Sequence, residues 1–327
     1  IADCVPLQEE TRTIAKLGLQ QMQQSQWDGI QKLLSFTDTD PNEINENTVG
    51  FTIGPRLNAA SRIGDVTRAV ELFLGDVDKN GQRIEYLERL NESRKLKTEA
   101  TLTQALKQVD ESKSCQLLFQ KDWEQGILGL VAGRIYEKID QPVVLGRETG
   151  GRIAASCRAP QGFSMISALR NIEELLGKYG GHDGAAGFEA DIKNKDIIAE
   201  ALHSYFTKQE RETTPLEISA SLSPNIINYD VANFLQSLSP FGMGNPAPIF
   251  CFESVQIIAK QWMGKGENHF KISGLKEEEI FEFMIFFRPE WFSLIKEESI
   301  VNIAFNLNES YWRGERQIKL KVVDIKK

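Results

Sequence analysis

The middle of the chain alternates short apolar runs with amphipathic helical patterns. Four runs have the length and apolar character of strands: 115–119, 142–146, 152–158 and 185–192. Three other stretches carry apolar residues at helical spacing: 126–139, 164–176 and 195–206. Strands that alternate with helices predict a sheet covered by helices, as in an α/β domain.

The residues before this region predict one long helix and the tail of another α/β domain. Residues 82–109 are highly charged, contain no helix breaker and carry only a thin apolar stripe. Such a pattern suits a helix that bridges domains. Within 1–75 the opening run IADCVPL is strand-like, Gly54 and Pro55 break the chain, and Asp65 can cap a following helix.

The pattern changes after residues 207–215, a polar segment that ends in proline and predicts a linker. Beyond it the apolar runs are strand-like and the connections are short and polar. The predicted strands are 249–258, 269–274, 280–287, 299–307 and 317–325. Five strands in so short a segment predict a small barrel, and an oligonucleotide-binding (OB) fold is the obvious candidate.

Composition and charge narrow the class of protein. The chain has 327 residues, of which 41% are hydrophobic and 26% charged, as in a soluble globular protein. No apolar run approaches the roughly 20 residues that cross a bilayer, and no signal peptide is visible. The first residue is Ile1, so we expect a piece of a longer protein. The net charge of −8 argues against a protein that binds polyanions over its whole surface, but it allows a local basic face.

The cysteines argue against structural crosslinks. The four lie far apart and form no C-x-x-C pair: Cys4, Cys115, Cys157 and Cys251. A zinc site or a disulfide framework is therefore not expected, and a reducing cytoplasm fits best.

The stretch GGHDGAAGF, 180–188, is the strongest local signal for chemistry. Gly180 and Gly181 let the backbone approach a ligand closely. His182 at the tip can donate to an oxyanion or take up a proton. The same residues also fit a glycine-rich turn that carries an exposed histidine.

Two further stretches place cations beside small polar residues. Ser156 and Arg158 are two apart on a predicted strand, so both project to one face, where they can hold a phosphate. The segment GPRLNAASR supplies three more candidates: Arg56, Asn58 and Arg62. An ordinary surface pair and a helix start with surface arginines are the alternatives. In 122–134, Gly126, Gly129, Ala132 and Gly133 favour close helix–sheet packing.

The predicted barrel has its own candidates for binding a single strand. Three residues lie near one turn and strand: Lys265, His269 and Lys271. Three aromatic residues could stack on bases: Phe270, Tyr311 and Trp312. Lys319 and Lys321 could join Lys265 and Lys271 along one groove. A basic groove with aromatic residues holds single strands without sequence choice. The alternative is that the aromatics are core and the lysines a solvated edge.

Taken in order, 54–62, 122–134, 151–163 and 180–188 resemble the RecJ family of single-strand-specific DNA exonucleases, within the DHH phosphoesterase superfamily. The opening IADCVPLQEETR resembles the last metal-site motif of the DHH domain, and 238–250 resembles the entry to the family's OB domain. The resemblance implies four parts: the C-terminal remnant of the DHH domain (1–78), a linking helix (79–112), a DHH-associated α/β domain (113–207) and an OB-fold nucleic-acid-binding domain (216–327).

The resemblance also implies roles for residues. Ser156 and Arg158 match the phosphate pocket, His182 matches the catalytic histidine of the glycine-rich loop, and Asp3 matches a metal-ligand aspartate. Arg56, Asn58 and Arg62 match a motif near the cleft, without individual roles. The chain departs from the family at Glu124-Gln125, where His-Pro is frequent, at Ser61, where glycine is usual, and at Cys157, where small residues are usual.

The resemblance implies manganese or magnesium in the intact protein. We expect none bound in this chain, because the D-x-D and DHH motifs are absent and Asp3 alone is only part of a site. The expected function is the C-terminal part of a 5′-to-3′ single-stranded-DNA exonuclease in DNA repair and recombination. Single-stranded DNA is the expected partner, single-strand-binding protein or a helicase are candidates, and no membrane is expected.

Two other functions stay open. One is a non-catalytic nucleic-acid-binding or replication-scaffold relative, which intact upstream metal motifs would exclude. The other is a phosphoesterase for short oligonucleotides, against which the long helix and the added barrel argue.

Overall fold

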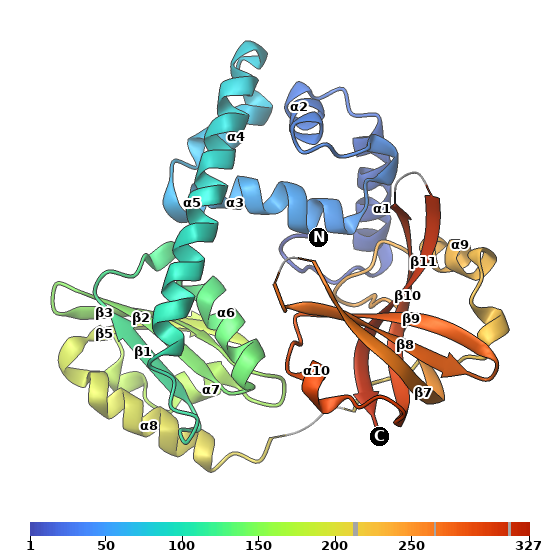
Figure 1. The fold of residues 1–327 in the computed structure, drawn as a ribbon. Helices are drawn as coiled ribbons and strands as arrows, with labels where there is room; N and C mark the ends of the chain where they lie inside the picture. The colour runs from blue at the N-terminus through green and yellow to red at the C-terminus, as the bar shows by residue number, and fades with distance from the viewer. Residues whose placement is uncertain (212–214, 265, 313–314) are drawn as a thin grey trace. The chain divides into compact units, whose positions relative to one another are not determined.

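The computed structural model describes residues 1–211, 215–264, 266–312 and 315–327, with the backbone alone at 310–312 and 315. By its internal contacts the chain divides into two compact units. We call residues 21–215 the sheet unit and residues 1–20 together with 216–327 the barrel unit (Figure 1). Residues 1–20 thus belong to the same unit as the barrel, whereas residues 21–78 of the expected 1–78 segment belong to the sheet unit.

The sheet unit is built on a five-stranded sheet with the order β1-β2-β3-β5-β4. Its strands are β1 (Gln116–Gln120), β2 (Val143–Thr149), β3 (Arg152–Arg158), β4 (Lys178–Gly181) and β5 (Ala185–Asp191). β1 and β2 pair in parallel, and the other pairs are antiparallel. The predicted strands are confirmed, whereas β4 was not predicted, because its sequence KYGG is short and half glycine.

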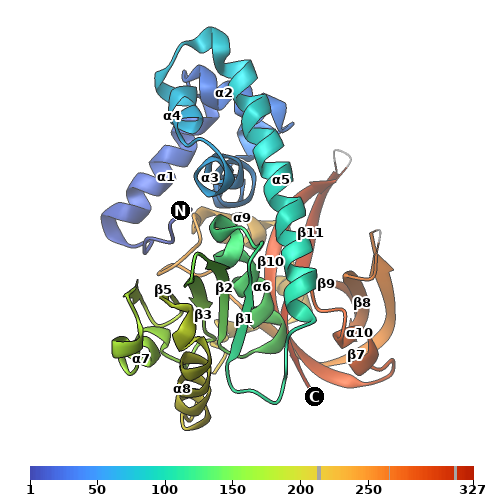
Figure 2. The same ribbon diagram turned by 90° about the vertical axis from the view of Figure 1, so that its left-hand side faces the viewer.

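Helices cover both faces of this sheet (Figure 2). One face packs on α6 (Leu128–Ile139) through a core that includes Leu118, Val143 and Leu145. The opposite face packs on α7 (Met165–Arg170) and α8 (Lys195–Thr207). Strand alternation therefore places Ser156 and Arg158 on the α6 face, since Cys157 between them is fully buried in the other core.

A helical region precedes the sheet. Its elements are α2 (Asp28–Phe36), a π-helical turn (Thr48–Ile53), α3 (Gly54–Ile63), α4 (Thr67–Leu74) and α5 (Asn80–Leu106). The prediction that Gly54 and Pro55 break the chain is wrong, because they begin α3, whose first turn needs no proline N–H. Asp65 accepts from the Thr67 N–H at 2.9 Å, but it lies one residue before the N-cap of α4, which is Val66. The long helix is confirmed as the 27-residue α5.

Two expected elements differ in the structure. The segment 164–176 forms only α7 and a short 3₁₀ turn (Glu173–Leu175), rather than one amphipathic helix. The opening run is not a strand. Pro6 cannot donate to a strand ladder, and Leu7 instead buries its side chain and donates its N–H to the Met243 carbonyl at 2.6 Å.

The barrel unit is a closed five-stranded barrel, as the OB fold predicts. Its strands are β7 (Phe250–Met263), β8 (His269–Lys276), β9 (Glu279–Phe286), β10 (Ile300–Trp312) and β11 (Glu315–Lys326). Neighbours pair in antiparallel fashion except β9 and β11, and β10 returns to pair with β7, which closes the ring. The helix α10 (Trp291–Leu294) connects β9 to β10. Phenylalanines fill the interior, among them Phe252, Phe270, Phe283 and Phe305.

Smaller elements complete the barrel unit. β6 (Ala220–Ser221) pairs with the start of β7, α9 (Tyr229–Ser237) packs on the core, and α1 (Glu9–Gln23) begins in this unit. Arg12 on α1 donates to the Leu238 carbonyl at 2.7 Å. The opening motif and the 238–250 motif therefore contact each other. None of the helices in the described parts of the chain combines the length and apolar character needed to cross a membrane.

Candidate nucleic-acid interface

The first half of the site lies where β3 meets the beginning of α6. An ideal Cβ on Gly129, in the first turn of α6, would lie 2.8 Å from Nη2 of Arg158 and 3.7 Å from Oγ of Ser156. Any larger residue there would require the guanidinium to shift from this position. A 3₁₀ turn (Gln125–Ile127) leads directly into α6, and the Leu128 N–H donates to the Gln125 carbonyl, so the start of α6 contributes partial positive charge. Hydroxyl, guanidinium and helix terminus thus converge on one place, which suits a phosphate.

The second half is the hairpin between β4 and β5. The His182 N–H donates to the Ala185 carbonyl at 2.7 Å, and the Ala185 N–H returns a bond at 3.2 Å. Gly181 has φ +141°, and a Cβ on it would lie 2.3 Å from the Ala185 carbonyl oxygen, so this position requires glycine. His182 itself is exposed at the turn.

The hairpin tip is held by neighbouring backbone and side chains. The Ala159 N–H, directly after β3, donates to the Gly184 carbonyl at 3.1 Å. The Met165 N–H at the start of α7 donates to the Asp183 carbonyl at 2.9 Å, and the Ser164 hydroxyl bonds the Asp183 carboxylate. The turn that carries His182 is therefore positioned by the end of β3 and the start of α7.

Strand register brings the two halves to one face. Ser156 pairs with Gly187, which pairs with Gly180. One row further, Arg158 pairs with Ala185, and the two bonds between Ala185 and His182 continue the ladder by one pair. Arg158 and His182 are thus two strand spacings apart, about 10 Å between backbones. The residues between them are small, so the face stays open.

A cavity of about 250 Å³ opens on this face beside Ser156. Gly187 lines it, as do Leu128 at the start of α6 and Gln125 in the turn before that helix. Lys178 and Tyr179 of β4 and Glu189 of β5 also line it. The candidate phosphate position therefore continues into a polar hollow along the sheet.

Two arginines from the helical region add positive charge beside Arg158. Arg62 on α3 donates through Nη1 to the Gly126 carbonyl at 3.0 Å, just before α6. Burial lowers the pKa of Arg62, and the charge of Arg158 lowers it further. Burial and the charge of Arg62 likewise lower the pKa of Arg94. Three guanidinium groups from three elements thus lie within electrostatic range.

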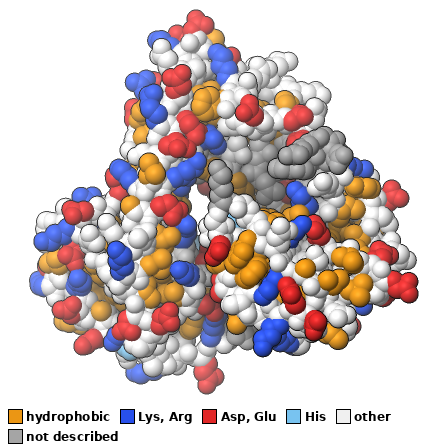
Figure 3. All heavy atoms as spheres, viewed as in Figure 1, with side chains coloured by type: hydrophobic (Ala, Val, Ile, Leu, Met, Phe, Trp, Pro, Cys, Tyr) orange, Lys and Arg blue, Asp and Glu red, His pale blue; other side chains and the backbone are white. Residues whose placement is uncertain are grey.

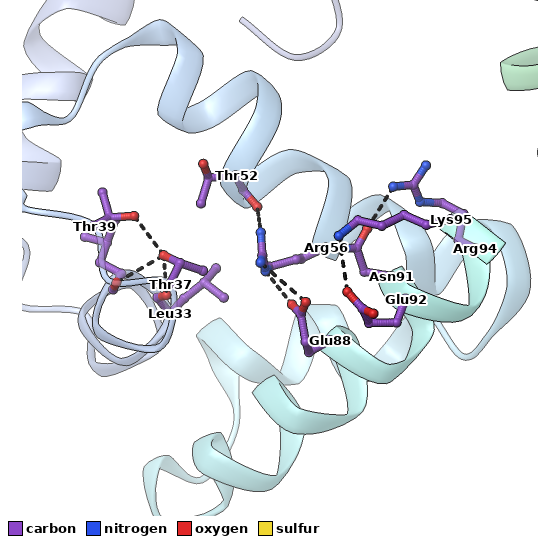
Figure 4. A network of polar contacts seen from close by, with 11 residues as sticks. Leu33, Thr37, Thr39, Thr52, Arg56, Glu88, Asn91, Glu92, Arg94 and Lys95 are labelled. Atoms are coloured by element: carbon purple, nitrogen blue, oxygen red, sulfur yellow. Dashed lines mark hydrogen bonds and ion pairs between the residues drawn. The ribbon is translucent and has the colours of Figure 1, made fainter. Parts of the chain in front are cut away.

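Arg94 was not predicted from the sequence. It lies on α5, where Asn91, itself 1% exposed, accepts from its Nη2 at 2.9 Å (Figure 4). Its buried Nε has no hydrogen-bond partner within the described part of the chain. Local sequence gave no signal, because α5 carries charged residues along its whole length.

Arg56 forms an ion pair with Glu88 and does not lie beside the Ser156 position with a free guanidinium. Its Nε donates to Glu88 of α5 at 2.5 Å and its Nη1 to the Thr52 carbonyl at 2.7 Å, so the guanidinium fixes α3 against α5 (Figure 4). Both side chains of the ion pair are mostly buried. Asn58, on the same helix, is exposed. Of the three residues in this motif, Arg62 is the one beside Arg158.

The outer face of β8, β9 and β11 gathers the predicted barrel lysines. Lys271 pairs in register with Met284, which pairs with Lys321. Lys271 also forms an ion pair with Glu282 at 2.5 Å, and Lys321 lies 5.8 Å from the Phe286 ring centre. His269 accepts from the Phe287 N–H at 3.1 Å, and its ring contacts Phe287, which is 78% exposed.

The remaining predictions for the barrel concern its aromatic residues and Lys265. Phe270 is fully buried in the barrel core, so the prediction that it stacks on bases is wrong. Its ring points inward because it alternates with His269 and Lys271 along β8. Lys265 and the side chains of Tyr311 and Trp312 lie outside the described residues. Across the face in view, acidic and basic side chains are interspersed (Figure 3), so binding of an anion depends on local arrangement.

Asp3, the predicted metal ligand, is exposed in the barrel unit. No group of three or more His, Cys, Asp or Glu side chains that could hold a metal ion occurs among the residues the structure describes. Hard divalent cations need several oxygen ligands, so the described residues do not by themselves fit such an ion.

Comparison with known protein families finds a match within each unit. Residues 106–208 match the DHHA1 domain family, and residues 218–324 match the RecJ OB domain family. The single-stranded-DNA-specific exonuclease RecJ of Thermus thermophilus is 31% identical over 100% of this chain and 47% of its own length. The RecJ of Bacillus subtilis is 27% identical over 99% of this chain and 42% of its own length.

Solved structures that are similar to this chain come from the same family as these sequence relatives. Thermus thermophilus RecJ in complex with Mn²⁺ has a TM-score of 0.87 at 28% identity and covers 100% of this chain and 48% of its own. A structure of the same protein with Mg²⁺ has a TM-score of 0.84 at 28% identity, over 100% of this chain and 50% of its own. The chain therefore spans half or less of the length of these relatives.

Proposed function

Because this chain matches the C-terminal part of the RecJ family, we propose that it is the DNA-holding part of a single-strand-specific exonuclease. The intact protein would digest DNA from 5′ to 3′ in repair and recombination. The observation that carries the proposal is the convergence of Ser156, Arg158 and the α6 terminus on one open face, with Arg62 and Arg94 alongside.

The sheet unit would bind the terminal phosphate of the strand. Arg158 donates through Nη1 to the Cys157 carbonyl at 2.8 Å, and its remaining planar N–H groups would donate to the phosphate oxygens. The Ser156 hydroxyl would bind a further oxygen, and the partial positive charge at the start of α6 would attract the phosphate. His182, one row along the face, would donate to a neighbouring phosphate oxygen or hold a proton there. Gly180 and Gly187 leave room for the sugar.

The barrel unit would hold the strand without reading its sequence. Strands β8 and β9 correspond to the OB-fold strands whose outer face binds oligonucleotides. Lys271, Lys319 and Lys321 would meet phosphates, while exposed rings such as Phe287 offer surfaces for bases. The acidic partner of Lys271, Glu282, weakens this attraction, which is consistent with weak and salt-sensitive binding.

The metal chemistry would belong to the intact protein. Divalent metal ions activate a water and stabilise charge on the phosphate in such hydrolysis. Asp3 would contribute one ligand, and the described residues offer no complete set. Single-strand-binding protein or a helicase are proposed partners, and we place the intact protein in the cytoplasm, where the four free cysteines would stay reduced.

Equilibrium binding tests the proposal. The chain should bind a 5′-phosphorylated oligonucleotide about tenfold more tightly than its 5′-hydroxyl twin, since a charged hydrogen-bonded contact is worth about 1.5 kcal/mol or more. Arg158→Ala should remove that preference. Arg170→Ala, an exposed arginine on α7 over the opposite face, is the control and should keep it. Equal affinity for both oligonucleotides in the unaltered chain would refute the phosphate site.

A further inference from the structure

A second basic position lies on the same sheet face. Arg147 on β2 lines a cavity of about 280 Å³ together with Gln125, Thr149 and Arg152. The Nε of Arg147 is buried and has no hydrogen-bond partner among the residues that the structure describes. A buried donor without a partner costs free energy, and more so on a charged group. The cavity therefore lacks an acceptor that a ligand could supply.

The charge around this cavity is positive. Arg147 and Arg152 line the cavity with one carboxylate, Glu189. Asp191 pairs with Arg152 in register and interacts with its charge, but Lys193 forms an ion pair with that carboxylate at 3.2 Å. Arg152 and Glu189 approach to only 3.6 Å, with side chains 63% and 44% exposed, so their pairing is weak. With Asp191 balanced by Lys193, two guanidinium groups and one loosely bound carboxylate leave a net attraction for an anion. Guanidinium forks match phosphate oxygens in particular.

This cavity adjoins the one beside Ser156. Both are lined by Gln125, Ala154 and Glu189, so the two hollows lie next to each other along the sheet. Arg147 pairs in register with Ala154, which lies two residues from Ser156 and four from Arg158 on β3. These steps correspond to about 7 Å and about 13 Å. A ligand with two phosphates therefore matches this backbone spacing better than a single phosphate does.

We propose that Arg147 and Arg152 form a second phosphate subsite, which takes an internucleotide phosphate of the strand whose terminal phosphate lies at Ser156 and Arg158. The inference rests on the proposed function and extends it. Glu189, between the two positions, repels a phosphate from the space between them and so favours a sugar and base there. The face therefore selects a strand of at least two nucleotides over a mononucleotide.

Two probes separate the subsites: thymidine 5′-monophosphate, which fills only the first, and 5′-phosphorylated tetrathymidylate, which reaches both. Their affinities are measured for the unaltered chain and for Arg147→Gln, Arg158→Gln and the control Arg170→Gln. We expect Arg147→Gln to weaken the tetranucleotide about tenfold and to leave the monophosphate within about twofold. Arg158→Gln should weaken both probes, and Arg170→Gln neither.

Salt dependence gives a second readout. Loss of one phosphate contact should lower the log–log salt slope for the tetranucleotide by up to about 0.7 in Arg147→Gln, whereas Arg147→Lys keeps the charge and most of the slope. Thermal unfolding checks that each variant folds. If Arg147→Gln does not fold, Arg152→Gln replaces it, since that side chain is mostly exposed. It should show a several-fold loss for the tetranucleotide alone.

The outcomes distinguish this inference from the proposed function. If Arg158→Gln weakens both probes while neither Arg147→Gln nor Arg152→Gln affects the tetranucleotide, the second subsite is refuted and the first stands. If Arg147→Gln weakens both probes equally, Arg147 belongs to the first subsite and the inference is wrong. If Arg158→Gln changes neither probe, the proposed function itself fails.

Discussion

The two units present their positive charge in different ways. In the sheet unit the cations beside Ser156 are partly buried, lie on rigid elements and have few acidic partners: Arg62 and Arg94 are partnered by a carbonyl and an amide. In the barrel unit Lys271 is paired with a carboxylate and Lys321 lies over an aromatic ring. Preorganised cations suit recognition of one phosphate group, whereas exposed, partly neutralised cations suit loose contact with any strand.

The largest expected effect is the absence of catalysis by either unit. Incubation of the chain with a labelled 5′-phosphorylated oligonucleotide and manganese should release no nucleotide, because the described residues offer no set of ligands for a metal ion. If nucleotide release follows the protein peak through purification, the proposal that the metal chemistry lies outside this chain is wrong.

The next effect contrasts the two kinds of cation. In the intact protein, Arg158→Ala should lose about 2 kcal/mol or more of transition-state stabilisation, roughly thirtyfold in kcat/KM. Lys271→Ala should lose much less, because Glu282 already neutralises that charge at 2.5 Å. Steady-state kinetics on one 5′-phosphorylated substrate compares them. Similar losses of kcat/KM in Arg158→Ala and Lys271→Ala would contradict the proposed difference between the cations of the two units.

Gly129 sharpens the comparison without removing a charge. A methyl group there would lie 2.8 Å from Nη2 of Arg158, so Gly129→Ala should displace the guanidinium. We expect most of the preference for a 5′-phosphate to be lost, about fivefold to tenfold. Gly133→Ala on the same helix is the matched control, since a methyl group there meets nothing within 4 Å. Titrations of the two oligonucleotides should separate the variants, and a normal preference in Gly129→Ala would contradict the proposed position of Arg158.

The barrel should respond to salt more than to any one substitution. With 5′-hydroxyl oligonucleotides, two to four phosphate contacts would give a log–log slope of about −1.4 to −2.8. Lys321→Ala should weaken binding only a few-fold and lower the slope by about 0.7. Titrations at several salt concentrations, on single and double strands, measure both. No binding at low salt, or equal affinity for duplex, would mean that the barrel docks something other than single strands.

The smallest effect concerns Glu189. Its carboxylate lines both cavities of the sheet face, so Glu189→Gln should strengthen binding of the 5′-phosphorylated tetranucleotide about twofold to threefold, as expected for a partly exposed charge. Glu174→Gln, an exposed carboxylate in the turn after α7, is the control. Weaker binding in Glu189→Gln would contradict this prediction and would indicate that the carboxylate forms a favourable contact with the oligonucleotide.

The sequence predicted elements where local pattern decides structure. β3 was predicted residue for residue, because RIAASCR alternates faces between glycines and a proline. The alternation also predicted that Ser156 and Arg158 share a face, and register places both on the α6 side. β4 was missed because its pairing with β5, rather than its own composition, makes it a strand.

Charge pairing could not be predicted, because it depends on residues distant in the chain. Arg56 and Arg62 have equal claims in GPRLNAASR, yet Glu88, 32 residues away, pairs with Arg56 alone. Arg94 and Arg147 gave no signal, since only the folded chain buries their Nε atoms. Phe270 could not be placed from aromatic content, because barrel register decides which rings point inward.

A crystal structure of the chain with 5′-phosphorylated tetrathymidylate tests the central claim most directly. The account predicts the terminal phosphate within hydrogen-bond distance of Arg158 and Ser156, at the start of α6, with the next nucleotides running toward Ala154. A terminal phosphate bound elsewhere, with Arg158 free of contact to the oligonucleotide, would contradict it.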